Sequence, residues 1–154
     1  MKKLFLTMLI ALVGISAMAQ DKKYGLGFNL LYGTEIKNIG FGVKGQYYAT
    51  EAVRLEVDGA FFPKKNEVKE YDAHLVGHYL IPVAESMKVY PIAGAGITSW
   101  VVDAFDADVE FTVNLGGGFE FDIAEDFALT AEVKYQIIKH YNQAVFGIGA
   151  VYKF

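Results

Sequence analysis

Large apolar residues occupy every second position along most of the chain that follows residue 19. Eight segments carry this alternation, at residues 25–32, 38–47, 52–62, 71–80, 89–98, 109–121, 127–137 and 144–154. A period of two predicts β-strands with one apolar and one polar or small-residue face. The chain is therefore predicted to be all-β, with eight antiparallel strands in an up-and-down order.

The connections between these segments fall into two alternating classes. Three compact ones are predicted to be periplasmic turns: Tyr48–Glu51, Ile81–Met87 and Asp122–Asp126. Four others would face outward: Thr34–Lys37, Pro63–Asn66, Ser99–Asp108 and Lys139–Gln143. Segments of about ten alternating residues separated by turns are typical of transmembrane β-barrels. Only Ser99–Asp108 has any length, so no large external domain is expected.

The size of the apolar side chains decides which face is predicted to point inward. Most are Phe or Tyr, and an eight-stranded barrel has little room for such bulk inside. We therefore expect the apolar face to contact lipid and the other face, thinned by glycine, to line the lumen. The predicted lumen network contains Lys44, Arg54, Glu56, Asp58, Asp72, His74, His78, Glu120, Glu132 and Lys134.

Aromatic residues also gather near the predicted strand ends. Two aromatic girdles at the membrane interfaces are expected of a spanning barrel. The residues assigned to the interfaces are Tyr47, Tyr79, Trp100, Phe127 and Tyr135. The location predicted from these features is the outer membrane, with membrane lipid as a partner and a monomer as the expected state.

The first 19 residues have the pattern of a signal peptide. Lys2 and Lys3 precede the apolar run Leu4–Ile15, and the small residues of Ser16–Ala19 form a cleavage site before Gln20. Residues 20–154 would then form the barrel. The chain has no cysteine and a formal net charge of −4 without a basic run. Disulfides, thiolate metal sites and nucleic-acid binding are therefore not expected.

Few residues suit catalysis or metal binding. His74 and His78 would share one strand face about 13 Å apart, at ~3.3 Å per residue, which is too far for one ion. The serines after residue 19 are Ser86 and Ser99, and neither adjoins a histidine. His140 has no hydroxyl residue directly beside it except Tyr141. We therefore expect no enzyme, no metal and no cofactor.

Several short motifs resemble a known family. The chain ends in Gly149-Ala-Val-Tyr152-Lys-Phe154, which resembles the C-terminal assembly signal of outer-membrane proteins, although Gly147 replaces its usual polar residue. The other motifs are residues 88–96, 114–121 and 132–135. Together they resemble the OmpX/OmpA-like small outer-membrane β-barrels of Gram-negative bacteria. The resemblance implies periplasmic chaperones and the barrel-assembly machinery as partners, with Gly149, Tyr152 and Phe154 as the signal.

The predicted function is a structural or surface-interaction role without catalysis. Contacts with a partner would use the outward loops, above all Ser99–Asp108. The lumen charges are predicted to form a self-paired plug, because an unpaired buried charge costs several kcal/mol. One alternative is a small-solute pore of low conductance, opened when these pairs switch. A second alternative is a soluble periplasmic barrel that binds an apolar ligand, which requires the apolar face to point inward.

Overall fold

The computed structural model describes residues 22–65, 67–103 and 106–154. The predicted signal peptide and its cleavage site before Gln20 lie outside these residues. The described residues form nine β-strands: β1 (Tyr24–Gly33), β2 (Asn38–Tyr48), β3 (Val53–Lys65), β4 (Val68–Tyr79), β5 (Ile81–Ala84), β6 (Met87–Asp103), β7 (Asp106–Asp122), β8 (Phe127–Ile138) and β9 (Asn142–Lys153). None of the described residues forms a helix long and apolar enough to cross a membrane.

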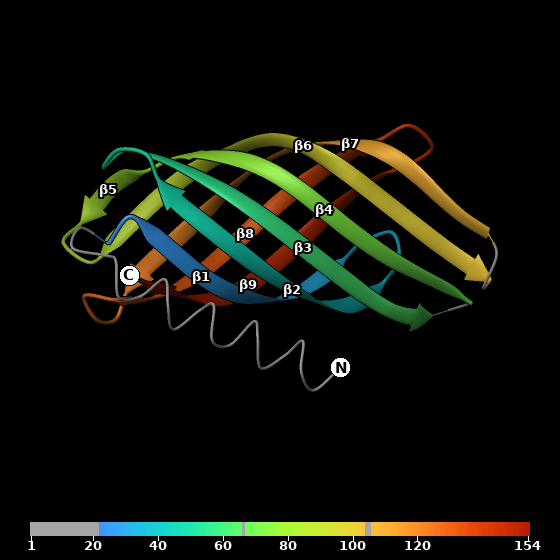
Figure 1. Cartoon of the computed structure of the whole chain (residues 1–154), viewed down its shortest axis with the longest axis horizontal. Helices are drawn as coiled ribbons and strands as arrows, with labels where there is room; N and C mark the ends of the chain where they lie inside the picture. The colour runs from blue at the N-terminus through green and yellow to red at the C-terminus, as the bar shows by residue number, and fades with distance from the viewer. Residues whose placement is uncertain (1–21, 66, 104–105) are drawn as a thin grey trace.

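The strands close into a barrel (Figure 1). Their order is β4-β3-β2-β1-β9-β8-β7-β6-β5, and a further pairing of β4 with β6 completes the ring. β5 continues β4, because His78 pairs with Ile92 and Ile81 pairs with Val89 in one register. Pro91 lies at the interruption and has no N–H to donate. The barrel wall thus has eight antiparallel members, here called staves, because β4 and β5 together count as one. This confirms the predicted all-β fold.

Both described ends of the chain lie at one end of the barrel, which we call the terminal end (Figure 1). There Tyr24 and Phe154 exchange backbone hydrogen bonds of 3.0 and 2.9 Å. β1 and β9 pair from Gly25 opposite Lys153 onward, so the first and last strands form the closing seam. The opposite end, which we call the distal end, carries the connections at residues 34–37 and 139–141, the last residues of β3 and β6 and the first residues of β4 and β7.

The predicted loop Ser99–Asp108 is wrong, because most of it is strand. β6 and β7 have 17 residues each, whereas the other main staves have 10 to 13. Their pairing continues through Trp100 opposite Asp108 to Asp103 opposite Asp106. A continuous antiparallel ladder satisfies backbone groups that a loop would leave to solvent. The same correction applies at Pro63–Asn66, where β3 runs to Lys65, at Ile81–Met87, which contains β5, and at Lys139–Gln143, where β9 begins at Asn142.

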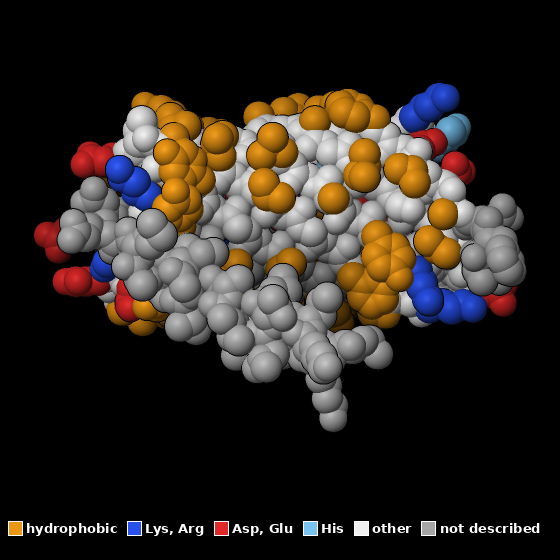
Figure 2. Space-filling view, in the orientation of Figure 1, with side chains coloured by type: hydrophobic (Ala, Val, Ile, Leu, Met, Phe, Trp, Pro, Cys, Tyr) orange, Lys and Arg blue, Asp and Glu red, His pale blue; other side chains and the backbone are white. Residues whose placement is uncertain are grey.

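The outer surface of the barrel is apolar (Figure 2). Phe28, Phe41 and Phe111 are 63%, 59% and 66% exposed, and they belong to a belt of large apolar side chains on all eight staves. The charged face points inward, as β8 shows by alternating exposed and buried residues along its whole length. The inward apolar face that a soluble apolar-ligand barrel requires is therefore not observed.

Two small apolar clusters bound the polar interior. Val76, Leu80, Tyr90 and Ile92 pack together toward the terminal end. Leu31, Phe62 and Val145 pack toward the distal end. These clusters are too small to form an ordinary hydrophobic core, so most of the interior between them is filled by polar and charged side chains.

Glycine makes room for the largest inward side chains. A Cβ atom built on Gly118 would lie 2.3 Å from the Tyr90 ring, and one on Gly40 would lie 2.5 Å from the Phe62 ring. The close approach of these rings to a bare backbone explains why the inward face is rich in glycine.

The adjacent residues Gly117 and Gly118 of β7 provide a test of this packing. Gly118→Ala is expected to lower the free energy of unfolding by about 1–3 kcal/mol, because the added methyl group overpacks the interior against Tyr90. Gly117→Ala is the control, since its Cβ atom would meet only the Tyr90 carbonyl oxygen at an ordinary 3.5 Å. Urea titration of the detergent-folded protein measures both. Equal effects of the two substitutions would contradict the packing argument.

Candidate functional site

The barrel interior is the main concentration of polar side chains in the described chain. All ten residues assigned to the lumen network are buried: Lys44, Arg54, Glu56, Asp58, Asp72, His74, His78, Glu120, Glu132 and Lys134. They come from β2, β3, β4, β7 and β8. Period-two alternation places them all on one face, and closure of the sheet turns that face inward.

Arg54 organises the half of the interior nearest the terminal end. Its Nη1 forms an ion pair with Glu120, and its Nε donates to His78 Nδ1 at 3.0 Å. The guanidinium lies over the Tyr90 ring at 4.6 Å. Lys153 Nζ also donates to Glu120, at 2.6 Å. Lys88 Nζ of β6 lies 3.7 Å from the same carboxylate. Glu120 therefore has three cationic partners, from β3, β6 and β9.

Two further ion-paired groups occupy the middle of the interior. Lys44 Nζ lies 2.8 Å from Glu132 and 3.7 Å from Glu56. Tyr90 donates its hydroxyl proton to Glu132 at 2.7 Å. In the second group, Asp58 lies 2.8 Å from Lys134 Nζ and 3.1 Å from His74 Nδ1.

These contacts connect strands on different sides of the ring. β2 contributes Lys44, β3 contributes Arg54 and Asp58, and β8 contributes Glu132 and Lys134. The interior is therefore cross-braced by ion pairs, in addition to the backbone ladders around the wall.

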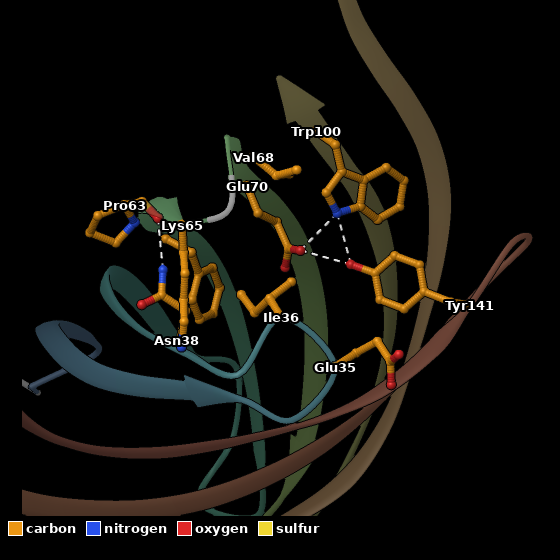
Figure 3. Close-up of a pocket in the computed structure, with 10 residues that line it drawn as sticks. Glu35, Ile36, Asn38, Pro63, Lys65, Val68, Glu70, Trp100 and Tyr141 are labelled. Carbon is orange, nitrogen blue, oxygen red and sulfur yellow. Dashed lines mark hydrogen bonds between the residues drawn. The ribbon is translucent and has the colours of Figure 1, made fainter. Parts of the chain in front are cut away.

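A different group of residues occupies the distal end (Figure 3). Glu70 Oε2 accepts hydrogen bonds from Trp100 Nε1 and the Tyr141 hydroxyl, both at 2.8 Å. Its Oε1 accepts from Gln143 Nε2 at 2.8 Å. Burial and the neighbouring Glu70 carboxylate raise the pKa of the Tyr141 phenol above its ordinary value. The phenol therefore keeps its proton and acts as a donor.

These residues border a pocket that opens at the distal end (Figure 3). Its volume is about 250 Å³. Trp100, Tyr141 and Glu70 form one side, and Pro63 and Lys65 form the other. Phe62 also lines the pocket. The remaining wall consists of Glu35, Ile36, Asn38 and Val68. The pocket combines aromatic rings with carboxylates, in contrast to the ion-paired interior below it.

The interfacial assignment of Trp100 is wrong. Trp100 pairs with Glu70 across β6 and β4 and shares the inward face of β6 with Thr98, so its indole points toward Glu70 rather than lipid. The sequence pattern predicts a loop at Trp100, whereas β6 continues through this residue and fixes which face it lies on. The other four assigned aromatics, Tyr47, Tyr79, Phe127 and Tyr135, are exposed on the outer surface.

Sequence reasoning missed several interior residues. Glu70 lies just before the predicted fourth segment, and Tyr141 and Gln143 lie in a predicted loop. Parity would have placed Glu70 inside, because it is two residues from Asp72. Tyr90 was recognised as an alternating position, but its contacts with Arg54 and Glu132 come only from closure of the barrel.

The three residues of the predicted assembly signal lie on the seam. Tyr152 is exposed on the outer surface, and its ring stacks with that of Phe154 at 6.1 Å. The Phe154 ring in turn stacks with Tyr24 of β1 at 6.3 Å. A Cβ atom on Gly149 would meet the backbone and side chain of β1, at Phe28 and Asn29. These positions show close packing between β9 and β1.

The described residues contain no side-chain cluster suited to a metal ion, and their histidines contact other groups. No group of three or more His, Asp or Glu side chains among them could hold a metal. His74 contacts Asp58, His78 accepts from Arg54, and His140 contacts Glu110. Within residues 22–65, 67–103 and 106–154, no histidine hydrogen-bonds to a serine or threonine.

Comparisons with known proteins agree with this architecture. The family model described as "Outer membrane protein beta-barrel domain" matches residues 5–154. No curated protein matches the sequence. Among solved structures, Neisserial surface protein A superposes with a TM-score of 0.73 at 13% identity, covering 86% of this chain and 97% of its own. The N-terminal barrel domain of Pseudomonas aeruginosa OprF has a TM-score of 0.69 at 15% identity, covering 84% and 97%.

The same fold also occurs in an enzyme. The outer membrane enzyme PagL superposes with a TM-score of 0.53 at 9% identity, covering 84% of this chain and 99% of its own. Likeness at such low identity shows the fold alone. Activity must therefore be argued from the side chains of this chain.

Removal of one member of a buried ion pair tests the bracing role of the interior. Arg54→Ala is expected to lower the free energy of unfolding by about 3–5 kcal/mol, because His78 and part of the Glu120 charge lose their partner in a buried site. Glu125→Ala is the control, since its ion pair with Lys22 lies at the surface and contributes little. Denaturant unfolding in detergent measures both. A loss for Arg54→Ala no larger than that for Glu125→Ala would contradict the bracing role.

Proposed function

This chain belongs to the outer membrane protein beta-barrel domain family, and from that premise we propose that it is an integral outer-membrane protein with structural and surface-interaction roles and no catalytic activity. The observation that carries the proposal is the distribution of apolar and charged side chains between the outside and the inside of the barrel. Large apolar side chains cover its exterior, and six carboxylates are buried inside it. Only a surrounding of lipid makes such an exterior stable.

The strand lengths support insertion in a membrane. A tilted transmembrane strand needs about 9–11 residues. The five strands β1, β2, β3, β8 and β9 have 10 to 13 residues each, which is enough to cross a membrane with little excess. Tyr24, Tyr47, Tyr152 and Phe154 form a linked aromatic group at the terminal end, where an interface would lie.

A structural role is supported by the filled interior. Arg54, Tyr90 and Lys44 are among the largest fully buried side chains, and each is held by ion pairs or ring contacts. Such an interior stiffens the barrel and obstructs the lumen. The predicted chaperone and assembly partners remain part of the proposal, supported by the aromatic C-terminal residues on the closing seam.

A surface-interaction role is supported by the end of the long hairpin. β7 pairs with β6 along its length, but its pairing with β8 begins only at Thr112 opposite Ile138. Residues 106–111 therefore present one strand edge without a neighbouring strand. Val109 and Phe111 are exposed beside it. An unpaired edge offers backbone groups to an extended segment of another protein, the mode of recognition called β-augmentation.

The absence of catalysis is proposed from the histidine contacts. His140 lies near the distal end and contacts Glu110, but no described serine or threonine hydrogen-bonds to it. A hydrolase of this size needs a nucleophile within hydrogen-bond reach of its base. The likeness to PagL therefore supports the fold without supporting its activity.

A low-conductance pore is the second candidate. It is favoured by buried polar atoms without a protein partner in the described chain, including both side-chain polar atoms of Asn114, Asp72 Oδ1 and His74 Nε2. Such atoms are commonly satisfied by water. Single-channel recording of the protein in planar bilayers separates a water-filled path from a closed plug.

Gel mobility tests the proposed membrane barrel. The protein folded in detergent is expected to migrate differently before and after boiling, because a closed barrel with a braced interior resists detergent until it is heated. Removal of detergent is expected to precipitate it. A protein that stays soluble without detergent and shows no mobility shift would contradict the outward assignment of the apolar face.

A charge on the unpaired edge tests the surface-interaction role. Val109→Lys is expected to reduce adhesion of cells displaying the protein to protein-coated surfaces by about tenfold, because a lysine on an edge strand opposes pairing with another strand. Glu67→Gln is the control, since it changes the formal charge by the same one unit in the exposed β3–β4 connection. Surface display of both variants is measured in parallel. Equal adhesion of the two variants would contradict a role for the edge.

A further inference from the structure

Two buried carboxylates differ from the others in the barrel. The buried carboxylates are Glu56, Asp58, Glu70, Asp72, Glu120 and Glu132. Four of them lie within 4.0 Å of a lysine or arginine nitrogen. Among the described residues, Glu70 and Asp72 have no such cation. Both lie on the inward face of β4 toward the distal end, so the negative charge there is not balanced by a direct ion pair.

The pocket beside Glu70 presents acceptors but few donors. Trp100, Tyr141 and Gln143 already direct their N–H and O–H groups at the Glu70 carboxylate. A carboxylate offers about four acceptor positions, so Glu70 retains one of them. Glu35 adds a second carboxylate to the wall. A ligand that completes this site must supply donors and positive charge.

Two aromatic rings stand on the same side of the pocket as Glu70 (Figure 3). The ring centroids of Trp100 and Tyr141 are 5.0 Å apart, with an angle of 50° between the planes. Their hydrogen bonds to Glu70 hold both rings in place. Cations are attracted to the faces of such rings, with indole the strongest. The rings and the two carboxylates therefore favour the same kind of ligand.

Lys65 does not neutralise this site. Its Nζ donates to the backbone carbonyl oxygen of Lys37, and the side chain is exposed at the rim of the pocket. Its ammonium forms no ion pair with Glu35 or Glu70 within 4.0 Å. The other wall residues, Ile36, Pro63 and Val68, offer apolar surface for a short hydrocarbon chain.

We propose that the pocket bounded by Glu35, Glu70, Trp100 and Tyr141 binds a small organic cation that carries a primary ammonium group. The ammonium supplies up to three donors and one positive charge to Glu70 and Glu35, and its first methylene groups pack against the aromatic and apolar walls. A volume of about 250 Å³ admits a short alkylamine but excludes a large ligand. Anions are disfavoured by the same two carboxylates.

Trp100 provides a direct readout, because it is the only tryptophan in the chain. The full chain, folded in detergent, is titrated with n-butylammonium at constant ionic strength while Trp100 fluorescence is recorded. We expect a saturable change with n-butylammonium and none with n-butanol, which has a similar size but no charge. No saturable change with n-butylammonium, or an equal change with n-butanol, would overturn the proposal.

Three carboxylate variants locate the binding. Glu70→Gln is expected to weaken n-butylammonium binding by about tenfold, which corresponds to about 1.4 kcal/mol. Glu35→Gln is expected to weaken it by a smaller factor. Glu85→Gln removes a similar charge in the β5–β6 turn at the terminal end and is expected to leave the affinity unchanged. Equal affinities in all three variants would overturn the assignment.

The test does not depend on the folding of one variant. Glu70 is buried in a strand, so the boiled-against-unboiled mobility shift is checked first for Glu70→Gln. Should that variant fail to fold, Glu35→Gln carries the comparison, because Glu35 lies in an exposed turn. If Glu35→Gln then binds n-butylammonium as tightly as the wild-type protein does, the proposal is overturned.

Discussion

The structure depends on mutual neutralisation of charges inside a narrow barrel. Its exterior is apolar, so the polar residues of every strand must be accommodated on the inner face. A buried charge without a partner costs several kcal/mol, and the ion pairs of Arg54 with Glu120 and of Lys44 with Glu132 avoid this cost. The same pairs hold opposite walls together. Glycine at positions such as Gly118 provides the space for Tyr90 among them.

The two ends of the barrel differ in charge and in backbone pairing. Toward the terminal end, acidic and basic side chains form ion pairs with one another. The seam between β1 and β9 is closed there by backbone hydrogen bonds and stacked rings. Toward the distal end, Glu70 and Asp72 lack a cationic partner within the described chain, and part of β7 lacks a neighbouring strand. The unbalanced carboxylates can bind a cationic ligand, and the unpaired strand edge can pair with a partner, so contacts with other molecules are expected at the distal end.

The family fold does not by itself determine activity. Small barrels of similar shape include Neisserial surface protein A, the N-terminal domain of OprF and the enzyme PagL, at identities of 9% to 15%. Activity in this chain must be judged from side chains near its distal end, where His140 contacts Glu110, and Trp100 and Tyr141 donate hydrogen bonds to Glu70.

The sequence by itself determined the number of staves, their antiparallel order and the face of each strand, because alternation with a period of two is a local property. It correctly placed Lys44, Arg54 and Glu132 on one face. It did not reveal that Lys44 contacts Glu132, because that contact joins residues 88 positions apart. The distal pocket likewise depends on tertiary structure. β6 pairs with β7 where the sequence pattern predicts a loop, and this pairing directs Trp100 toward Glu70.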